Sequence, residues 1–153
     1  MAIDQHKNDG LLDDPHVNDT FARKMKAVLA DIRGHGGQWY VTECYRPKER
    51  QRFLYSKGRS TATLRKAGFT DDEIKRYRSQ GSKASDSRVT TILTSMHCKG
   101  LACDIVPIVN GQLCWDAPSE MWTLIGSAAK AHGLVWGGSW KSFVDKPHVE
   151  MDI

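Results

Sequence analysis

A single carboxylate inside an apolar run most constrains how this chain can fold. Asp104 lies within residues 101–106 (LACDIV), where both faces of an extended strand are apolar, so we expect the strand and its carboxylate to be largely buried. Removing an ionised carboxylate from water costs several kcal/mol unless it is paired or bound to a metal ion. The fold must therefore bring a cation or several hydrogen-bond donors to Asp104.

His97 is the first candidate for that environment, because it precedes Asp104 by seven residues. A histidine in the turn before a strand and an aspartate inside the strand can converge on one point. The spacing alone nevertheless favours a simpler interpretation, in which backbone N–H groups hold the aspartate and His97 lies on the surface.

The C-terminal segment changes that balance. Asp145, His148 and Glu150 lie within six positions, and Pro147 disfavours helical backbone before it, which excludes a helical HExxH zinc site. In an extended strand His148 and Glu150 share a face. A catalytic zinc site typically has three protein ligands, often imidazoles, and one open position. We expect Asp145 to accept a proton from water at such a site, whose ligands would be His97, Asp104 and His148.

The composition indicates one globular domain spanning residues 1–153. The chain is 40% hydrophobic and 26% charged with a mean hydropathy of −0.50, which excludes a disordered chain and a membrane protein. No apolar run approaches the ~18 residues of a membrane span, and the polar N-terminus has no signal-peptide pattern. We therefore expect synthesis in the cytosol, with residues 1–17 forming a loosely attached arm.

The cysteines do not indicate a disulfide framework. There is no CxxC pair and no signal peptide, so each cysteine is expected to act as a small buried apolar residue. The four are Cys44, Cys98, Cys103 and Cys114.

Positive charge is concentrated in one stretch. Residues 46–88 contain 13 basic and five acidic side chains, a net charge of +8, whereas the remainder has a net charge of −4. This asymmetry indicates an anionic partner, either nucleic acid or a carboxylate-rich polymer. A solvated helical face is an equally favoured explanation.

The periodicity predicts an α+β fold with a small antiparallel sheet flanked by helices. Asn110-Gly111 predicts a two-residue hairpin turn, and the sequence TDDE at 70–73 predicts a capped helix at 71–79. Three further helices are expected, one that starts at Asn18 or Asp19 and ends at Gly34, one at 47–57 and one at 118–132. Strands are expected at 38–45, 101–106, 112–115, 134–136 and 148–151.

Three motifs together resemble a known family. Residues 95–104 (SMHCKGLACD) fit an SxHxxGxAxD signature, residues 145–148 (DKPH) fit its DxPH partner, and Tyr45-Arg46 follows a strand as in that family. The chain resembles the zinc peptidases that include D-Ala-D-Ala carboxypeptidases, vancomycin-resistance dipeptidases and phage L-alanyl-D-glutamate endopeptidases. The resemblance spans about 39–150 and implies a Hedgehog/D-Ala-D-Ala-peptidase-like fold with the zinc site in a cleft over the sheet. The 35 residues between Arg59 and Ser95 exceed the length expected for the phage members.

The resemblance also assigns roles. It implies Zn²⁺ as the cofactor, with His97, Asp104 and His148 as its ligands. It also implies Asp145 as the general base and Arg46 as the group that stabilises an oxyanion or a substrate carboxylate. Ser95 is implied as a substrate contact. From their positions alone, Glu150 is expected to orient His148 or to be a strand-edge charge. The loop containing Trp136 and Trp140 is expected either to line the cleft and bind substrate or to pack in the core.

The expected function is cleavage of the L-Ala–D-Glu bond in peptidoglycan stem peptides by a phage-type endolysin, which would reach the wall after holin-type release. An aspartate base and the small size favour this subgroup. The alternatives are a D-Ala-D-Ala carboxypeptidase or dipeptidase, a non-catalytic zinc-stabilised binding domain, and a nucleic-acid binder, which leaves the zinc residues unexplained. The expected protein is a monomer with peptidoglycan as its partner, without nucleic acid, stable membrane insertion or a separate wall-binding domain.

Overall fold

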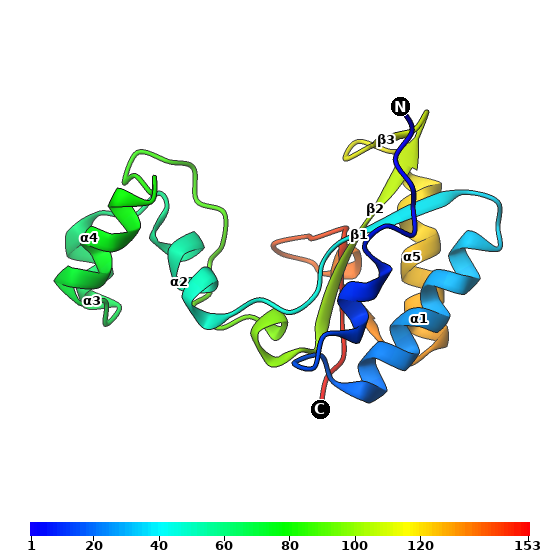
Figure 1. Cartoon of the computed structure of the whole chain (residues 1–153), viewed down its shortest axis with the longest axis horizontal. Helices are drawn as coiled ribbons and strands as arrows, with labels where there is room; N and C mark the ends of the chain where they lie inside the picture. The colour runs from blue at the N-terminus through cyan, green and yellow to red at the C-terminus, as the bar shows by residue number, and fades with distance from the viewer. The chain divides into compact units, whose positions relative to one another are not determined.

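The computed structural model describes residues 1–153, and these form two compact units (Figure 1). Met1–Tyr45 and Lys99–Ile153 form the first, here called the sheet unit. Arg46–Cys98 forms the second, here called the helical unit. That residues 1–153 act as one catalytic domain remains a prediction.

An antiparallel sheet organises the sheet unit, and the predicted α+β class is confirmed. The strand order is β1-β2-β5-β4, with β3 paired to β2. At the β2–β3 turn Asn110 and Gly111 have φ values of 53° and 77°, as the two-residue hairpin turn requires. The strands are β1 (Gln38–Glu43), β2 (Ala102–Val109), β3 (Gln112–Leu113), β4 (Val135–Trp136) and β5 (His148–Glu150).

Two helices complete the core of this unit. In α1 (Asp19–Arg33) apolar residues recur at helical spacing, and the Asn18 side chain accepts a hydrogen bond from the N–H of Phe21. In α5 (Ser119–Ala131) Trp122 and Ile125 are buried. α1 packs on both α5 and β1, so the core lies between these helices and the sheet.

Residues 1–17 are not a loose arm, and that prediction was wrong. Leu12 and Val17 are buried, and the 3-10 helix η1 (Asp9–Asp13) packs on α1 and β1. The Asn8 amide donates to the Val41 carbonyl at 3.1 Å. Arg33 donates to both carboxylate oxygens of Asp9 at 2.7 and 2.9 Å. Leu12 and Val17 are five residues apart, which matches neither a helical nor a strand period, so no periodicity marks them.

The helical unit has a small core of its own. It contains α2 (Lys48–Ser56), α3 (Thr61–Lys66) and α4 (Asp71–Ser79), and only α3 was not predicted. Thr70 caps α4 by accepting a hydrogen bond from the N–H of Glu73 at 3.1 Å, as the sequence TDDE indicated. Its buried apolar residues are Leu64, Phe69, Ile74 and Tyr77.

Of two further 3-10 helices, η2 (Met96–Lys99) carries the ligand candidate His97, and η3 (Gly137–Ser139) contacts the turn that contains Asp145. None of the helices combines the length and the apolar content that crossing a bilayer requires.

Candidate metal and catalytic site

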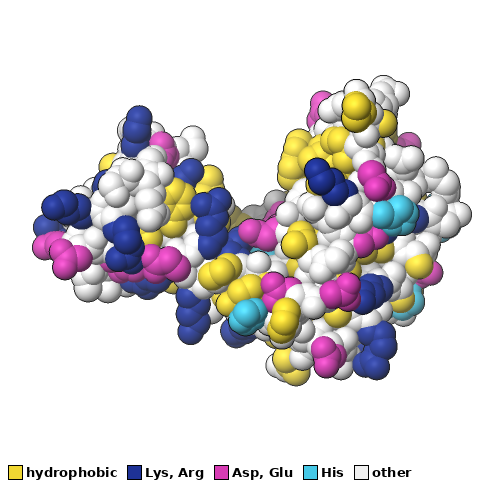
Figure 2. All heavy atoms as spheres, in the orientation of Figure 1, with side chains coloured by type: hydrophobic (Ala, Val, Ile, Leu, Met, Phe, Trp, Pro, Cys, Tyr) yellow, Lys and Arg dark blue, Asp and Glu magenta, His cyan; other side chains and the backbone are white.

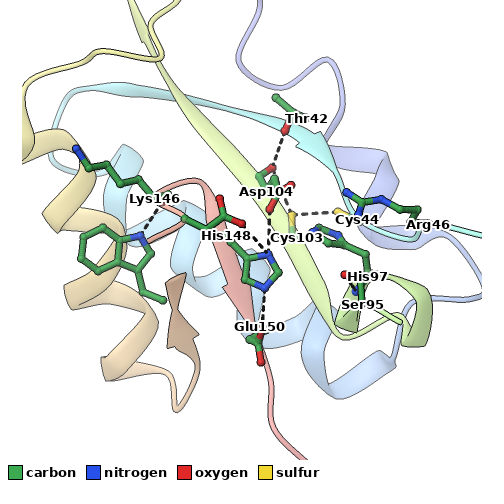
Figure 3. A network of polar contacts seen from close by, with 12 residues as sticks. Thr42, Cys44, Arg46, Ser95, His97, Cys103, Asp104, Lys146, His148 and Glu150 are labelled. Carbon is green, nitrogen blue, oxygen red and sulfur yellow. Dashed lines mark hydrogen bonds and ion pairs between the residues drawn. The ribbon is translucent and has the colours of Figure 1, made fainter. Parts of the chain in front are cut away.

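Three side chains from η2, β2 and β5 gather as the sequence predicted. His97, Asp104 and His148 each offer one ligand atom, and these atoms lie within 4.8 Å of one another (Figure 3). Asp104 and His148 are direct partners in the β2–β5 register, which fixes their separation through the backbone. His97 is 3% exposed, so the interpretation that placed it on the surface was wrong. The Asp104 side chain is 20% exposed, which agrees with its expected burial.

The donor set fits zinc. Tetrahedral zinc with ligand bonds of about 2.0–2.1 Å requires ligand atoms about 3.3 Å apart. His148 Nδ1 lies 3.2 Å from Asp104 Oδ1, close to that spacing. The nearby Cys103 is not part of this group, and burial together with its hydrogen bond to Cys44 raises the pKa of its thiol well above its usual range.

The other ring nitrogen of His148 is held by Glu150. His148 Nε2 lies 2.7 Å from Glu150 Oε1, so the carboxylate accepts its N–H and leaves Nδ1 facing Asp104. Burial lowers the pKa of His148, but the hydrogen bonds with Asp104 and Glu150 outweigh it and raise the pKa to about 9. This contact is the one expected of a residue that orients His148, and that role of Glu150 remains a prediction.

Asp145 lies beside the cluster and reaches solvent. Its Oδ2 is 3.9 Å from His148 Nδ1, and its side chain is 48% exposed. Its backbone N–H donates to the Gly137 carbonyl at 3.0 Å, and a Cβ at Gly137 would collide with the Asp145 carbonyl, so η3 supports this turn. A cavity of about 380 Å³ opens at the same place, lined by Trp115, Trp122 and residues 144–147. Trp115 was not foreseen, because the sequence does not show which exposed aromatics border the site.

Arg46 is tied to the loop that carries His97. Its backbone N–H donates to the His97 carbonyl at 3.0 Å. Its guanidinium donates to Gln51 Oε1 at 2.7 Å. Gln51 is fully buried and donates to the Ile92 carbonyl at 2.8 Å, so it anchors the guanidinium to the chain before η2. Sequence reasoning missed Gln51, because a glutamine in a polar helix carries no signal of burial.

The remaining predicted residues have structural contacts. Ser95 is buried, and its hydroxyl accepts the N–H of His97 at 3.2 Å. The Trp136 indole donates to the Lys146 carbonyl at 2.7 Å and thereby fastens β4 to the turn before β5. The Trp140 ring lies 5.3 Å from the His148 ring. Substrate contacts by these three residues remain predictions.

Known proteins resemble this chain in sequence. A family model described as D-alanyl-D-alanine carboxypeptidase matches residues 88–151, the segment that contains all three ligand candidates. The peptidoglycan L-alanyl-D-glutamate endopeptidase CwlK of Bacillus subtilis (strain 168) is 29% identical over 157 residues, covering 95% of this chain and 81% of its own. The L-alanyl-D-glutamate peptidase of Listeria phage A118 is 31% identical over 81 residues, covering 52% of this chain and 29% of its own.

Solved structures agree in fold. The Serratia marcescens L-Ala D-Glu endopeptidase ChiX matches with a TM-score of 0.60 and 21% identity, over 97% of this chain and 89% of that chain. The vancomycin resistance D,D-pentapeptidase VanY, solved in complex with Zn(II), matches with a TM-score of 0.54 and 18% identity. The match covers 88% of this chain and 72% of that chain. Taken with the sequence matches, these findings confirm the predicted resemblance of the chain to the peptidases that include D-Ala-D-Ala carboxypeptidases and L-alanyl-D-glutamate endopeptidases.

Proposed function

We propose that the protein is a zinc peptidase that hydrolyses the L-Ala–D-Glu bond of peptidoglycan stem peptides. The observation that carries the proposal is the convergence of His97, Asp104 and His148 beside the half-exposed carboxylate of Asp145. The names of CwlK and of the Listeria phage relative support this bond. The description of the matching family supports the second candidate, a D-Ala-D-Ala carboxypeptidase.

The metal would be held by His97, Asp104 and His148. A zinc ion bound there supplies Lewis-acid chemistry, because it makes water more acidic and polarises the carbonyl that is attacked. Glu150 keeps His148 in the tautomer whose Nδ1 can bind a metal. The Trp140 ring lies tilted beside the same ring.

Asp145 would act as the general base. Its carboxylate lies close to the ligand group and is open to solvent, so it can accept a proton from the attacking water and pass it to the leaving amine. The backbone N–H of Arg46 donates a hydrogen bond to the His97 carbonyl, and the Arg46 guanidinium would place positive charge toward the developing oxyanion or a substrate carboxylate. Ser95 and Trp136 would shape the site through the contacts described above.

The biological setting belongs to the same proposal. The phage relative supports action as a phage-type endolysin on the cell wall after holin-type release from the host cytoplasm. The protein would act as a monomer, without a nucleic-acid partner or stable membrane insertion.

Digestion of purified peptidoglycan tests the proposal. Mass spectrometry of the released muropeptides should show new N-terminal D-Glu, and a chelator should abolish the reaction. Release of free D-Ala would instead identify a carboxypeptidase, and metal-independent binding without turnover would identify a binding domain. Asp145→Asn should retain zinc but lose about 10²–10⁴-fold in kcat. Full activity of that variant would remove the general-base role.

A further inference from the structure

Two buried thiols that the proposed mechanism does not use lie side by side in the sheet unit. Cys44 Sγ and Cys103 Sγ are 3.0 Å apart, and the two residues are 1% and 0% exposed. Glu43 and Asp104 are partners in the antiparallel β1–β2 register. Cys44 follows Glu43 and Cys103 precedes Asp104, so the two cysteines face each other. Figure 3 shows both sulfurs beside the ligand cluster.

We propose that Cys44 and Cys103 form a disulfide when the protein folds in, or reaches, an oxidising compartment. Neighbouring antiparallel strands place opposed Cα atoms about 4.5–5.5 Å apart, within the range that a disulfide spans. The sulfurs need to approach by only about 1 Å to reach a bond length of about 2.05 Å. The other two cysteines are differently placed, since the Cys114 thiol faces Asp116 at 3.4 Å and Cys98 lies in η2.

The oxidant is a small-molecule or protein disulfide acting by thiol–disulfide exchange. One cysteine sulfur, having lost its proton, attacks the oxidant and forms a mixed disulfide with release of one oxidant thiol. The second cysteine sulfur, also deprotonated, attacks the first and expels the other oxidant thiol. The protein thus loses two hydrogens, and the oxidant gains them as two thiols. Because both sulfurs are buried, the exchange takes place during folding or on opening of the β1–β2 pair.

The crosslink would join the two segments of the sheet unit between which the helical unit is inserted in the sequence. Cys44 precedes the helical unit by two residues, and Cys103 follows it by five. A bond between them closes a loop of about 60 residues. Restricting such a loop in the unfolded chain should raise the Tm on the order of 10 °C. The bond would also hold Cys44, just after β1, beside Cys103, which directly precedes the ligand candidate Asp104.

The test measures thiols and therefore does not depend on activity. The full-length protein is refolded in a glutathione redox buffer, quenched with acid, alkylated and mapped by mass spectrometry. We expect a mass loss of about 2 Da, a linked peptide pair containing Cys44 and Cys103, and a Tm that falls on addition of reductant. The matched control is the Cys98→Ala/Cys114→Ala double variant, which should behave in the same way. Cys103→Ala should lose both the link and the effect of the reductant.

Three results would overturn the inference. These are four alkylated thiols in oxidised buffer, a link that includes Cys98 or Cys114, and a Cys44–Cys103 link whose reduction leaves the Tm unchanged. The disulfide inference rests on the proposed function only in taking the cell wall as the oxidising compartment that the protein reaches. A linked but inactive protein would therefore contradict the proposed function alone, whereas an active protein with four thiols would contradict only the disulfide.

Discussion

The metal-free protein should carry a proton on His148 that metal binding must displace. Burial lowers the pKa of this imidazole, but Asp104 and Glu150 raise it to about 9, so the ring is charged at neutral pH. A metal ligand must be deprotonated. Each zinc ion bound at neutral pH should therefore release about one proton from His148. The apparent affinity should rise about tenfold per pH unit up to about pH 9 and then level off.

The same shift makes the stability of the chelated protein depend on pH. The folded pKa of about 9 exceeds the ordinary value of 6.5, so the folded state binds the proton more tightly than the unfolded chain does. The stabilisation is fully present below pH 6.5 and is lost as the pH rises through about 9. At about 1.4 kcal/mol per pKa unit, the loss approaches about 3 kcal/mol. The zinc-loaded protein, in which His148 is neutral, should not show this loss.

Two measurements check this reasoning. Urea unfolding of the chelated full-length protein at pH 6, 8 and 10 should show falling stability, and His148→Gln should remove this component. Calorimetric titration with zinc at pH 7, in buffers of different ionisation enthalpy, should show heats that change with the buffer. Buffer-independent heats, or the same loss of stability in the variant, would refute the assignment of the proton to His148.

Two further predictions concern single side chains. Glu150→Gln should weaken zinc binding about 10–100-fold in a chelator competition, because the carboxylate that accepts the His148 N–H is lost, and unchanged affinity would contradict this role. Arg78→Ala should lower the free energy of unfolding by about 1–3 kcal/mol, because Arg78 donates to the carbonyls of Ser56 and Arg59 at 3.0 and 2.6 Å. In the same denaturation assay Lys75→Ala, on the exposed side of α4, should change stability by less than about 0.5 kcal/mol.

Most of the candidate site could be predicted, because its chemistry is concentrated in short motifs. A carboxylate inside an apolar strand and a histidine after a proline turn are local signals, and both lead to the observed cluster. The pairing that joins them was not visible, since the partnership of Asp104 with His148 spans 44 residues of sequence. The glutamine behind Arg46 was missed for the same reason. Its burial depends on residues near Ile92, and no periodicity in α2 reports them.

Gly100 shows how a motif residue can have a purely structural cause. Its φ is 69°, and a Cβ there would collide with the His16 carbonyl. Its own carbonyl accepts the N–H of Asn18, the residue that caps α1, at 2.9 Å. The signature glycine therefore lets the N-terminal segment pack against the turn between η2 and β2. The sequence could show the glycine but not its partner, which lies in the segment expected to be loose.

The charge of the helical unit shows why composition overstates a binding surface. Its Lys and Arg side chains are visible among acidic ones in Figure 2, and three of its arginines are already paired within the unit, Arg52 with Glu73, Arg65 with Asp71 and Arg76 with Glu49. Two more, Arg59 and Arg78, donate to backbone carbonyls and thereby hold the unit together. Arg59 and Arg78 therefore build the fold, and any attraction to an anionic wall polymer depends mainly on the other exposed cations, which are Lys48, Lys66, Lys75, Lys83, Arg50 and Arg88.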